Sequence, residues 1–183
     1  MAAMRTFDSR RALYVWGGAL LALAAVIVAG NVALARHAAL MRDLRPQTYI
    51  DRAQKAMEAG DFTGALAHWE EAYARAPGLH SVHKVRGDIY YAWRKWEDAL
   101  AAYREALRLG SPAPGVRLNA VWSLVELGRY EEARDFGLAC IQDGFQDPDL
   151  SRRTAEACFR GKLFADAVPL YELALAGYPR DLY

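Results

Sequence analysis

Residues 62–77 read FTGALAHWEEAYARAP, and the same order of aromatic, small and bulky residues returns at 96–111, 130–145 and 164–179. Every copy has an alanine at the same place, and these alanines are 34 residues apart: Ala65, Ala99, Ala133 and Ala167. An aromatic residue stands three positions before each alanine, and a small residue stands seven positions after it. A fixed period of this length indicates a supersecondary unit that stacks on copies of itself and buries the face between neighbours.

Apolar residues recur every three or four positions in eight segments of this region, which is the spacing of amphipathic helices. The sequence therefore predicts two helices per unit: Tyr49–Ala59, Phe62–Ala76, Ser81–Trp93, Glu97–Leu109, Val116–Leu127, Tyr130–Ile141, Leu150–Arg160 and Ala165–Ala176. Gly60 and Gly128 are expected to make turns inside the first and third units. Pro77, Pro112 and Pro148 are expected to separate the units, because proline cannot continue a helix.

This pattern resembles the tetratricopeptide repeat over residues 46–183, in four copies: 46–79, 80–113, 114–147 and 148–183. The small residue that the family has in its first helix is present here as Ala53, Gly87, Val121 and Ala155. The bulky residue of the second helix is present as Trp69, Tyr103 and Tyr171, whereas Gly137 leaves a hole at this place in the third copy. The resemblance implies an all-α fold, a right-handed α-solenoid of four helix-turn-helix repeats.

A long uncharged segment precedes the repeats. The 24 residues from Ala12 to Ala35 carry no charge. As a helix they would span about 36 Å, more than the roughly 30 Å hydrocarbon core of a bilayer. We therefore predict a single transmembrane helix at 12–35, after a short basic tail at 1–11 and before a juxtamembrane linker at 36–45.

The same segment has features of a cleavable signal peptide, and this alternative stays open. Arg10 and Arg11 would form its basic start, and Ala33-Leu34-Ala35 has the small-x-small form of a cleavage site. Its apolar run is longer than the 7–15 residues typical of signal peptides, which favours retention in the membrane.

Three arginines precede the uncharged segment and three follow it within ten residues. Because the two numbers are equal, basic residues give almost no indication of which end of the span lies in the cytosol. Because a short basic tail usually stays in the cytosol, we expect a bacterial inner-membrane protein with periplasmic repeats. Small residues on one face of the span would allow another transmembrane helix to approach closely. These residues are Gly18, Ala22, Ala25, Ala29 and Ala33.

Charge and motif patterns argue against nucleic-acid binding and catalysis. Residues 1–45 carry six Lys/Arg and two Asp/Glu, whereas residues 46–183 carry 17 and 20, so the array has no basic stripe for nucleic acid. No glycine-rich phosphate loop, nucleophile elbow or His-Glu-x-x-His motif is present. His80 and His83 lie one helical turn apart but have no further ligands arranged around them. We expect no enzyme, cofactor or metal site.

The two cysteines are predicted to lie inside the array. Cys140 and Cys158 occupy inward repeat positions, where free cysteine commonly packs as a small apolar residue. A disulfide between them is the alternative if the compartment is oxidising.

In the proteins that this chain resembles, the first helix of every repeat lines a concave groove, and its inward residues contact a partner. Carried over residue by residue, these positions are Ile50, Gln54, Met57, Lys84, Asp88, Tyr91, Leu118, Trp122, Val125, Arg152, Glu156 and Phe159. One row among them, with a period of 34, forms an apolar ridge: Met57, Tyr91, Val125 and Phe159. Either this ridge packs between first helices, or it binds an amphipathic helix or extended segment of another protein.

These observations favour a non-catalytic, membrane-anchored scaffold or assembly factor that holds a protein partner of the bacterial envelope. The accessory role is what the resemblance implies. One alternative is a permanent structural subunit of a large membrane complex, and another is an exported binding protein cleaved after Ala35. The last helix, 165–176, carries few charges and many apolar residues. We expect this end of the array to dock on a partner subunit or a second copy of the chain.

Overall fold

The computed structural model describes residues 26–34, 36 and 45–177, and the chain divides into two units, Met1–Leu44 and Arg45–Tyr183. In the first unit residues 26–34 and 36 are helical. Across the described ranges, no helix has the length and apolar character needed to cross a bilayer. Of the predicted contact face, Ala29 and Ala33 lie in this helix and are exposed. The rest of that face (Gly18, Ala22 and Ala25), the tail 1–11 and most of the predicted span lie outside the described residues.

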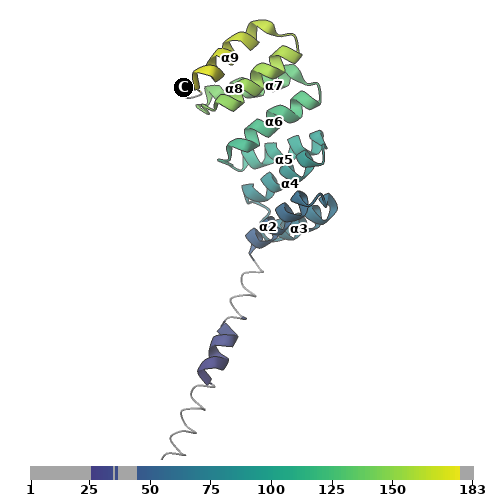
Figure 1. The fold of residues 1–183 in the computed structure, drawn as a ribbon, viewed down its shortest axis with the longest axis vertical. Helices are drawn as coiled ribbons and strands as arrows, with labels where there is room; N and C mark the ends of the chain where they lie inside the picture. Colours follow the sequence, from purple (N-terminus) through teal and green to yellow (C-terminus); the bar gives the residue numbers. More distant parts are fainter. Residues whose placement is uncertain (1–25, 35, 37–44, 178–183) are drawn as a thin grey trace, which may run out of the picture. The chain divides into compact units, whose positions relative to one another are not determined.

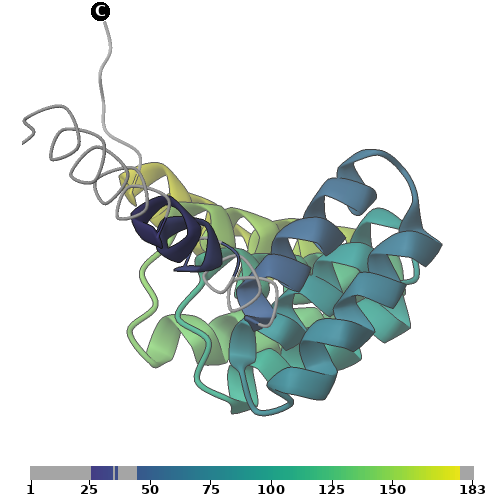
Figure 2. The ribbon, with the colours of Figure 1, turned by 90° about the horizontal axis from the view of Figure 1, so that it is seen from below.

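The second unit consists, in its described part, of eight helices that follow one another along a stack of pairs (Figure 1). Each repeat supplies one antiparallel pair, and the helices of a pair lie side by side when the stack is viewed from below (Figure 2). The helices are α2 (Pro46–Glu58), α3 (Phe62–Arg75), α4 (His80–Ala92), α5 (Trp96–Arg108), α6 (Pro114–Glu126), α7 (Tyr130–Gln142), α8 (Pro148–Arg160) and α9 (Phe164–Gly177). The predicted all-α repeat architecture is confirmed.

The alanine register is confirmed by burial. Ala65, Ala99 and Ala133 have no exposed surface, and Ala167 is 3% exposed. Close approach of helices explains why these positions and the first-helix glycine are small. A Cβ atom on Gly87 would lie 2.5 Å from Cε1 of Tyr103, well inside contact distance. Larger side chains at these places would force the two helices of a repeat apart.

The turn inside each repeat contains one residue with positive φ, again with a period of 34. Gly60 and Gly128 adopt φ values of 79° and 73°, which confirms the two predicted glycine turns. Arg94 and Lys162 adopt φ 62° at the equivalent places of repeats 2 and 4. Glycine adopts positive φ without steric strain, whereas Arg94 and Lys162, which have a Cβ atom, are strained there. The repeat geometry therefore holds these two residues in a conformation that their sequence does not favour.

The prolines correct the predicted helix boundaries. Pro46, Pro114 and Pro148 lie in the first turns of α2, α6 and α8, so these helices begin two or three residues earlier than predicted. Pro148 therefore starts a helix and does not stand between units. Proline fits this position because the first backbone N–H groups of a helix have no partner within it. Pro169 lies inside α9.

The hole expected at Gly137 is absent. Thr154 of α8 fills the space beside this glycine, and a Cβ atom on Gly137 would collide with Oγ1, Cγ2 and Cβ of Thr154. The Thr154 side chain is fully buried and donates a hydrogen bond of 2.8 Å to the Leu150 carbonyl oxygen. The next repeat therefore supplies the volume that an aromatic residue supplies in repeats 1, 2 and 4.

Cys140 and Cys158 are free and buried, as predicted. They belong to separate core clusters. Burial in apolar surroundings raises the pKa of both thiols, so the protonated, unreactive form is favoured.

Candidate functional site

The predicted groove positions lie on the first helices α2, α4, α6 and α8, which we call the first-helix face. Ile50 and Val125 are buried, with 3% and 2% of their surface exposed. Arg152 and Phe159 are exposed. The remaining predicted residues are half-buried: Gln54, Met57, Lys84, Asp88, Tyr91, Leu118, Trp122 and Glu156.

The predicted apolar ridge packs largely into the core of the array. Met57 contacts the N-terminal core cluster, and Val125 belongs to the central one. Tyr91 packs edge-on against Trp96 and Tyr103, with ring centroids 5.3 and 6.4 Å apart. Only Phe159 is well exposed in this row, at 57%. The contacts that the structure gives for the first three residues are thus packing contacts within the array.

Trp122 of α6 lies beside two arginines of α8. The guanidinium carbons of Arg153 and Arg160 are 5.7 and 5.0 Å from the centroid of the indole ring, within the range of cation–π attraction. Arg160 also pairs with Glu156 at 2.8 Å and Glu126 at 3.6 Å. The hydrogen bond to Glu156 raises the pKa of Arg160, so Arg160 stays positively charged. The two carboxylates neutralise this charge locally.

Arg153 differs from Arg160 because the groups to which it donates hydrogen bonds are uncharged. Its terminal nitrogen Nη1 donates to the Leu118 carbonyl oxygen at 3.2 Å and to Asn119 Oδ1 at 3.5 Å. Within the part of the chain that the structure describes, no carboxylate forms a salt bridge with Arg153. A half-buried guanidinium beside an indole, without a counter-ion, is a suitable place for a ligand carboxylate.

A chain of polar contacts holds this region together across three repeats. Asn119 Nδ2 donates to the hydroxyl oxygen of Tyr103 at 3.2 Å, and that hydroxyl donates to Asp88 Oδ1 at 3.0 Å. Asp88 in turn pairs with Lys84 at 2.5 Å. Burial is the main cause of the raised pKa of Tyr103, so its proton stays available for Asp88. The contacts fix Asn119, and through it the position of Arg153.

Repeat 3 lacks the tyrosine–carboxylate pair of its neighbours. In repeat 4 the Tyr171 hydroxyl donates to Glu156 at 3.3 Å, just as Tyr103 donates to Asp88 in repeat 2. Burial, and then the Glu156 charge, raises the pKa of Tyr171. In repeat 3 the equivalent positions are Gly137 and Trp122. Repeat 3 thus has neither the tyrosine nor the carboxylate, and the indole of Trp122 lies beside the two arginines instead.

The groove residues predicted from the sequence include Trp122 but not Asn119, Arg153 or Arg160. Each missed residue is one position further along its helix than a predicted groove residue. The sequence holds no signal for them beyond this proximity, because their roles depend on how α6 and α8 face each other.

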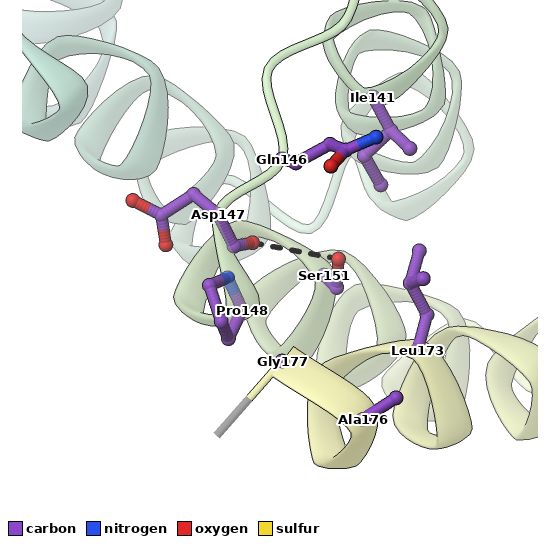
Figure 3. Close-up of a pocket in the computed structure, with 8 residues that line it drawn as sticks. All are labelled: Ile141, Gln146, Asp147, Pro148, Ser151, Leu173, Ala176 and Gly177. Atoms are coloured by element: carbon purple, nitrogen blue, oxygen red, sulfur yellow. Dashed lines mark hydrogen bonds between the residues drawn. The ribbon is translucent and has the colours of Figure 1, made fainter. Parts of the chain in front are cut away.

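Two cavities lie away from the predicted groove residues. The first, of about 360 Å³, lies between the loop before α8 and the end of α9 (Figure 3). It is lined by Ile141, Gln146, Asp147, Pro148, Ser151, Leu173, Ala176 and Gly177. Ser151 Oγ donates to the Asp147 carbonyl oxygen in its wall. The second, of about 340 Å³, is lined by the first residues of α7, by the turn before it and by Gly161.

Neither cavity contains a group of metal-ligating residues. In the described ranges no three His, Cys, Asp or Glu residues are grouped so as to hold a metal ion.

His83, one of the two histidines noted in the sequence, places Nε2 2.8 Å from the Pro77 carbonyl oxygen. It thus ties the connection between repeats 1 and 2 to α4.

Comparison with known proteins agrees with the fold. The structure is similar to YrrB, a TPR protein with an unusual peptide-binding site, at 15% identity and TM-score 0.64, over 78% of this chain and 74% of that chain. It is also similar to MamA from Desulfovibrio magneticus RS-1, at 13% identity and TM-score 0.62, over 72% and 74%. A third similar structure is PilW, a type IV pilus biogenesis factor, at 20% identity and TM-score 0.62, over 74% and 63%.

Sequence comparison identifies the family. No curated protein matches the chain. A tetratricopeptide repeat profile matches residues 50–114, 84–148 and 118–181, which together cover most of the chain. The chain therefore belongs to the tetratricopeptide repeat family.

Proposed function

We propose that this protein is a non-catalytic scaffold that binds a segment of a partner protein on its first-helix face, around Trp122. The observation that carries the proposal is the Arg153 guanidinium, which lies beside the indole and, among the residues that the structure describes, forms hydrogen bonds with uncharged groups alone. A repeat protein of the same fold, YrrB, has a peptide-binding site, which supports a polypeptide ligand.

The chemistry of the site favours a partner segment with an acidic side chain. A carboxylate would form charge-assisted hydrogen bonds with the unused N–H groups of Arg153. An adjoining apolar side chain would cover the indole of Trp122. Tryptophan and arginine are the residues on which binding energy is most often concentrated at protein interfaces. Asn119 and the Tyr103–Asp88 contacts hold the arginine in place, so little ordering is required on binding.

Substitution of the two central residues tests this proposal. Trp122→Ala and Arg153→Gln are each expected to weaken partner binding at least about tenfold, a loss of about 1.4 kcal/mol. The measurement is titration calorimetry with the partner identified by crosslinking in membranes. Arg108→Gln is the matched control, since the Arg108 side chain is 68% exposed and pairs within its own helix. Unchanged affinity in folded Trp122 and Arg153 variants would rule the site out.

We further propose that the array is held at the inner membrane of a bacterium by a transmembrane helix at 12–35, with the repeats in the periplasm. The uncharged run of 24 residues supports an anchor. The scaffold would then act on an envelope complex, as an assembly or accessory factor. The likeness to PilW, a pilus biogenesis factor, is compatible with such a role.

Two alternatives differ in where the chain resides and what it contacts. A permanent structural subunit would use the span, through Gly18, Ala22, Ala25, Ala29 and Ala33, and the array surface for lasting contacts. An exported binding protein would be cleaved after Ala35. Intact mass and alkaline carbonate extraction distinguish these states: we expect the uncleaved chain in the membrane pellet. A shortened chain in the soluble fraction would contradict the anchor.

A further inference from the structure

The outer side of repeat 4 carries an exposed apolar stripe, which we call the terminal stripe. It consists of Phe159, Phe164, Val168 and Leu175, with exposed fractions of 57%, 54%, 59% and 69%. The last three are spaced by four and seven residues and so lie on one face of α9. The rings of Phe159 and Phe164 pack edge-on with centroids 5.7 Å apart, which joins α8 to the stripe.

The same stripe exists in repeat 2, where the fold covers it. The equivalent residues, 68 positions earlier, are Tyr91, Trp96, Leu100 and Leu107. Leu100 is 1% exposed, against 59% for Val168, and the other three are half-buried. Leu100 shares a core cluster with Val116, Ala120 and Leu124 of α6, the first helix of the following repeat, and Tyr91 and Leu107 pack against that cluster. In repeat 2 this surface is therefore an interface for the helix that follows it.

In repeat 2 the helix that covers the stripe presents small and aliphatic residues. α6 contributes Val116, Ala120 and Leu124, which are spaced by four residues, fully buried, and part of the same cluster as Leu100 and Tyr103. Small and aliphatic residues on the covering helix fit between large side chains on the stripe, as ridges fit into grooves. An extended strand would not reproduce this spacing.

A second copy of the chain lacks a suitable surface. Head-to-tail stacking would place α2 on the terminal stripe, and α2 has Thr48, Arg52 and Ala56 where α6 has Val116, Ala120 and Leu124. α2 thus lacks the valine and leucine with which α6 covers the equivalent stripe in repeat 2, so it would bury less apolar surface there. Tail-to-tail packing would set two stripes of large residues against each other, without the small residues that make α6 fit.

We propose that the terminal stripe docks an amphipathic helix of another protein, which presents small and aliphatic residues four positions apart as α6 does. This surface lies on the outer side of α9 and is distinct from the Trp122 site. The scaffold would thus hold two segments at once, one on its first-helix face and one stacked on repeat 4 as a further helix.

A peptide with the α6 sequence, residues 114–126, serves as the probe. Because short helices are marginal in water, it is held helical by a lactam bridge on the side away from Ala120. Fluorescence anisotropy with the full chain is expected to show saturable binding. Val168→Glu with Leu175→Glu in the chain should weaken that binding at least about tenfold. Ala101→Glu, on the exposed side of α5, is the matched control and should change nothing.

Three further results decide the proposal. A peptide carrying Ala120→Glu should not bind, and the Trp122→Ala chain should bind the parent peptide as tightly as before, which separates this surface from the groove site. Sedimentation should show a monomer. Absence of peptide binding to the folded chain would overturn the proposal, and so would a dimer that Val168→Glu with Leu175→Glu dissociates, since a second copy would then occupy the stripe.

Discussion

Replacing Ala99 with arginine is expected to lower the free energy of unfolding by about 3–5 kcal/mol, the cost of an uncompensated buried charge. Ala99 has no exposed surface and lies in the central cluster, where α5 meets its neighbours. An arginine there would bury an unpaired guanidinium and overpack the junction. Urea unfolding followed by circular dichroism measures the change. The effect would show that the alanine register is what allows the helices to approach.

Ala101→Arg is the control for this prediction. Ala101 lies in the same helix, two residues further on, and is exposed. Arginine is a good helix former, so this variant should unfold within about 0.5 kcal/mol of the parent. Equal stability of the Ala99 and Ala101 variants would mean that the register of the repeats is wrong.

Gly137→Ala is expected to destabilise the protein by about 1–2 kcal/mol, although alanine is normally favoured over glycine inside a helix by about 1 kcal/mol. The added Cβ would collide with the whole Thr154 side chain, and overpacking of this kind costs about 1–3 kcal/mol. Gly115→Ala is the matched control, because nothing lies within 4 Å of its added Cβ. That variant should be as stable as the parent or slightly more so.

A double-mutant cycle locates the cause. Thr154→Ala removes two of the three atoms that Gly137→Ala would strike, so the second substitution should cost less in that background. Additive effects would show that Thr154 does not fill the space beside Gly137. They would restore the interpretation of a hole in repeat 3.

The repeat register was predictable because it depends on contacts between helices that are close in sequence, and these contacts recur in every repeat. Ala65 and its three counterparts are buried by the helix pairs of their own and adjoining repeats, so a period of 34 carries the information. Gly60 and Gly128 likewise indicate turns by themselves. Arg94 and Lys162 adopt the same left-handed conformation without any residue preference, and only the repeat geometry imposes it.

Features that depend on contacts between repeats could not be predicted from the sequence. Thr154 fills the space beside Gly137 from a different helix, 17 residues away. Val125 and Phe159 occupy equivalent positions, yet one is 2% and the other 57% exposed, because α8 covers the first. The pairing of Arg160 with Glu126 of α6 follows from the same packing. The membrane span at 12–35 stays a prediction.

Hydrogen exchange of the full chain, with and without its partner, tests the central claim most directly. Exchange reports which backbone segments are protected on binding. We predict that bound partner slows exchange in the accessible parts of α6 and α8 around Trp122 and Arg153, while α3, α5 and α7 exchange as in the free chain. Protection confined to those second helices, with α6 and α8 unchanged, would contradict a scaffold that binds through its first-helix face.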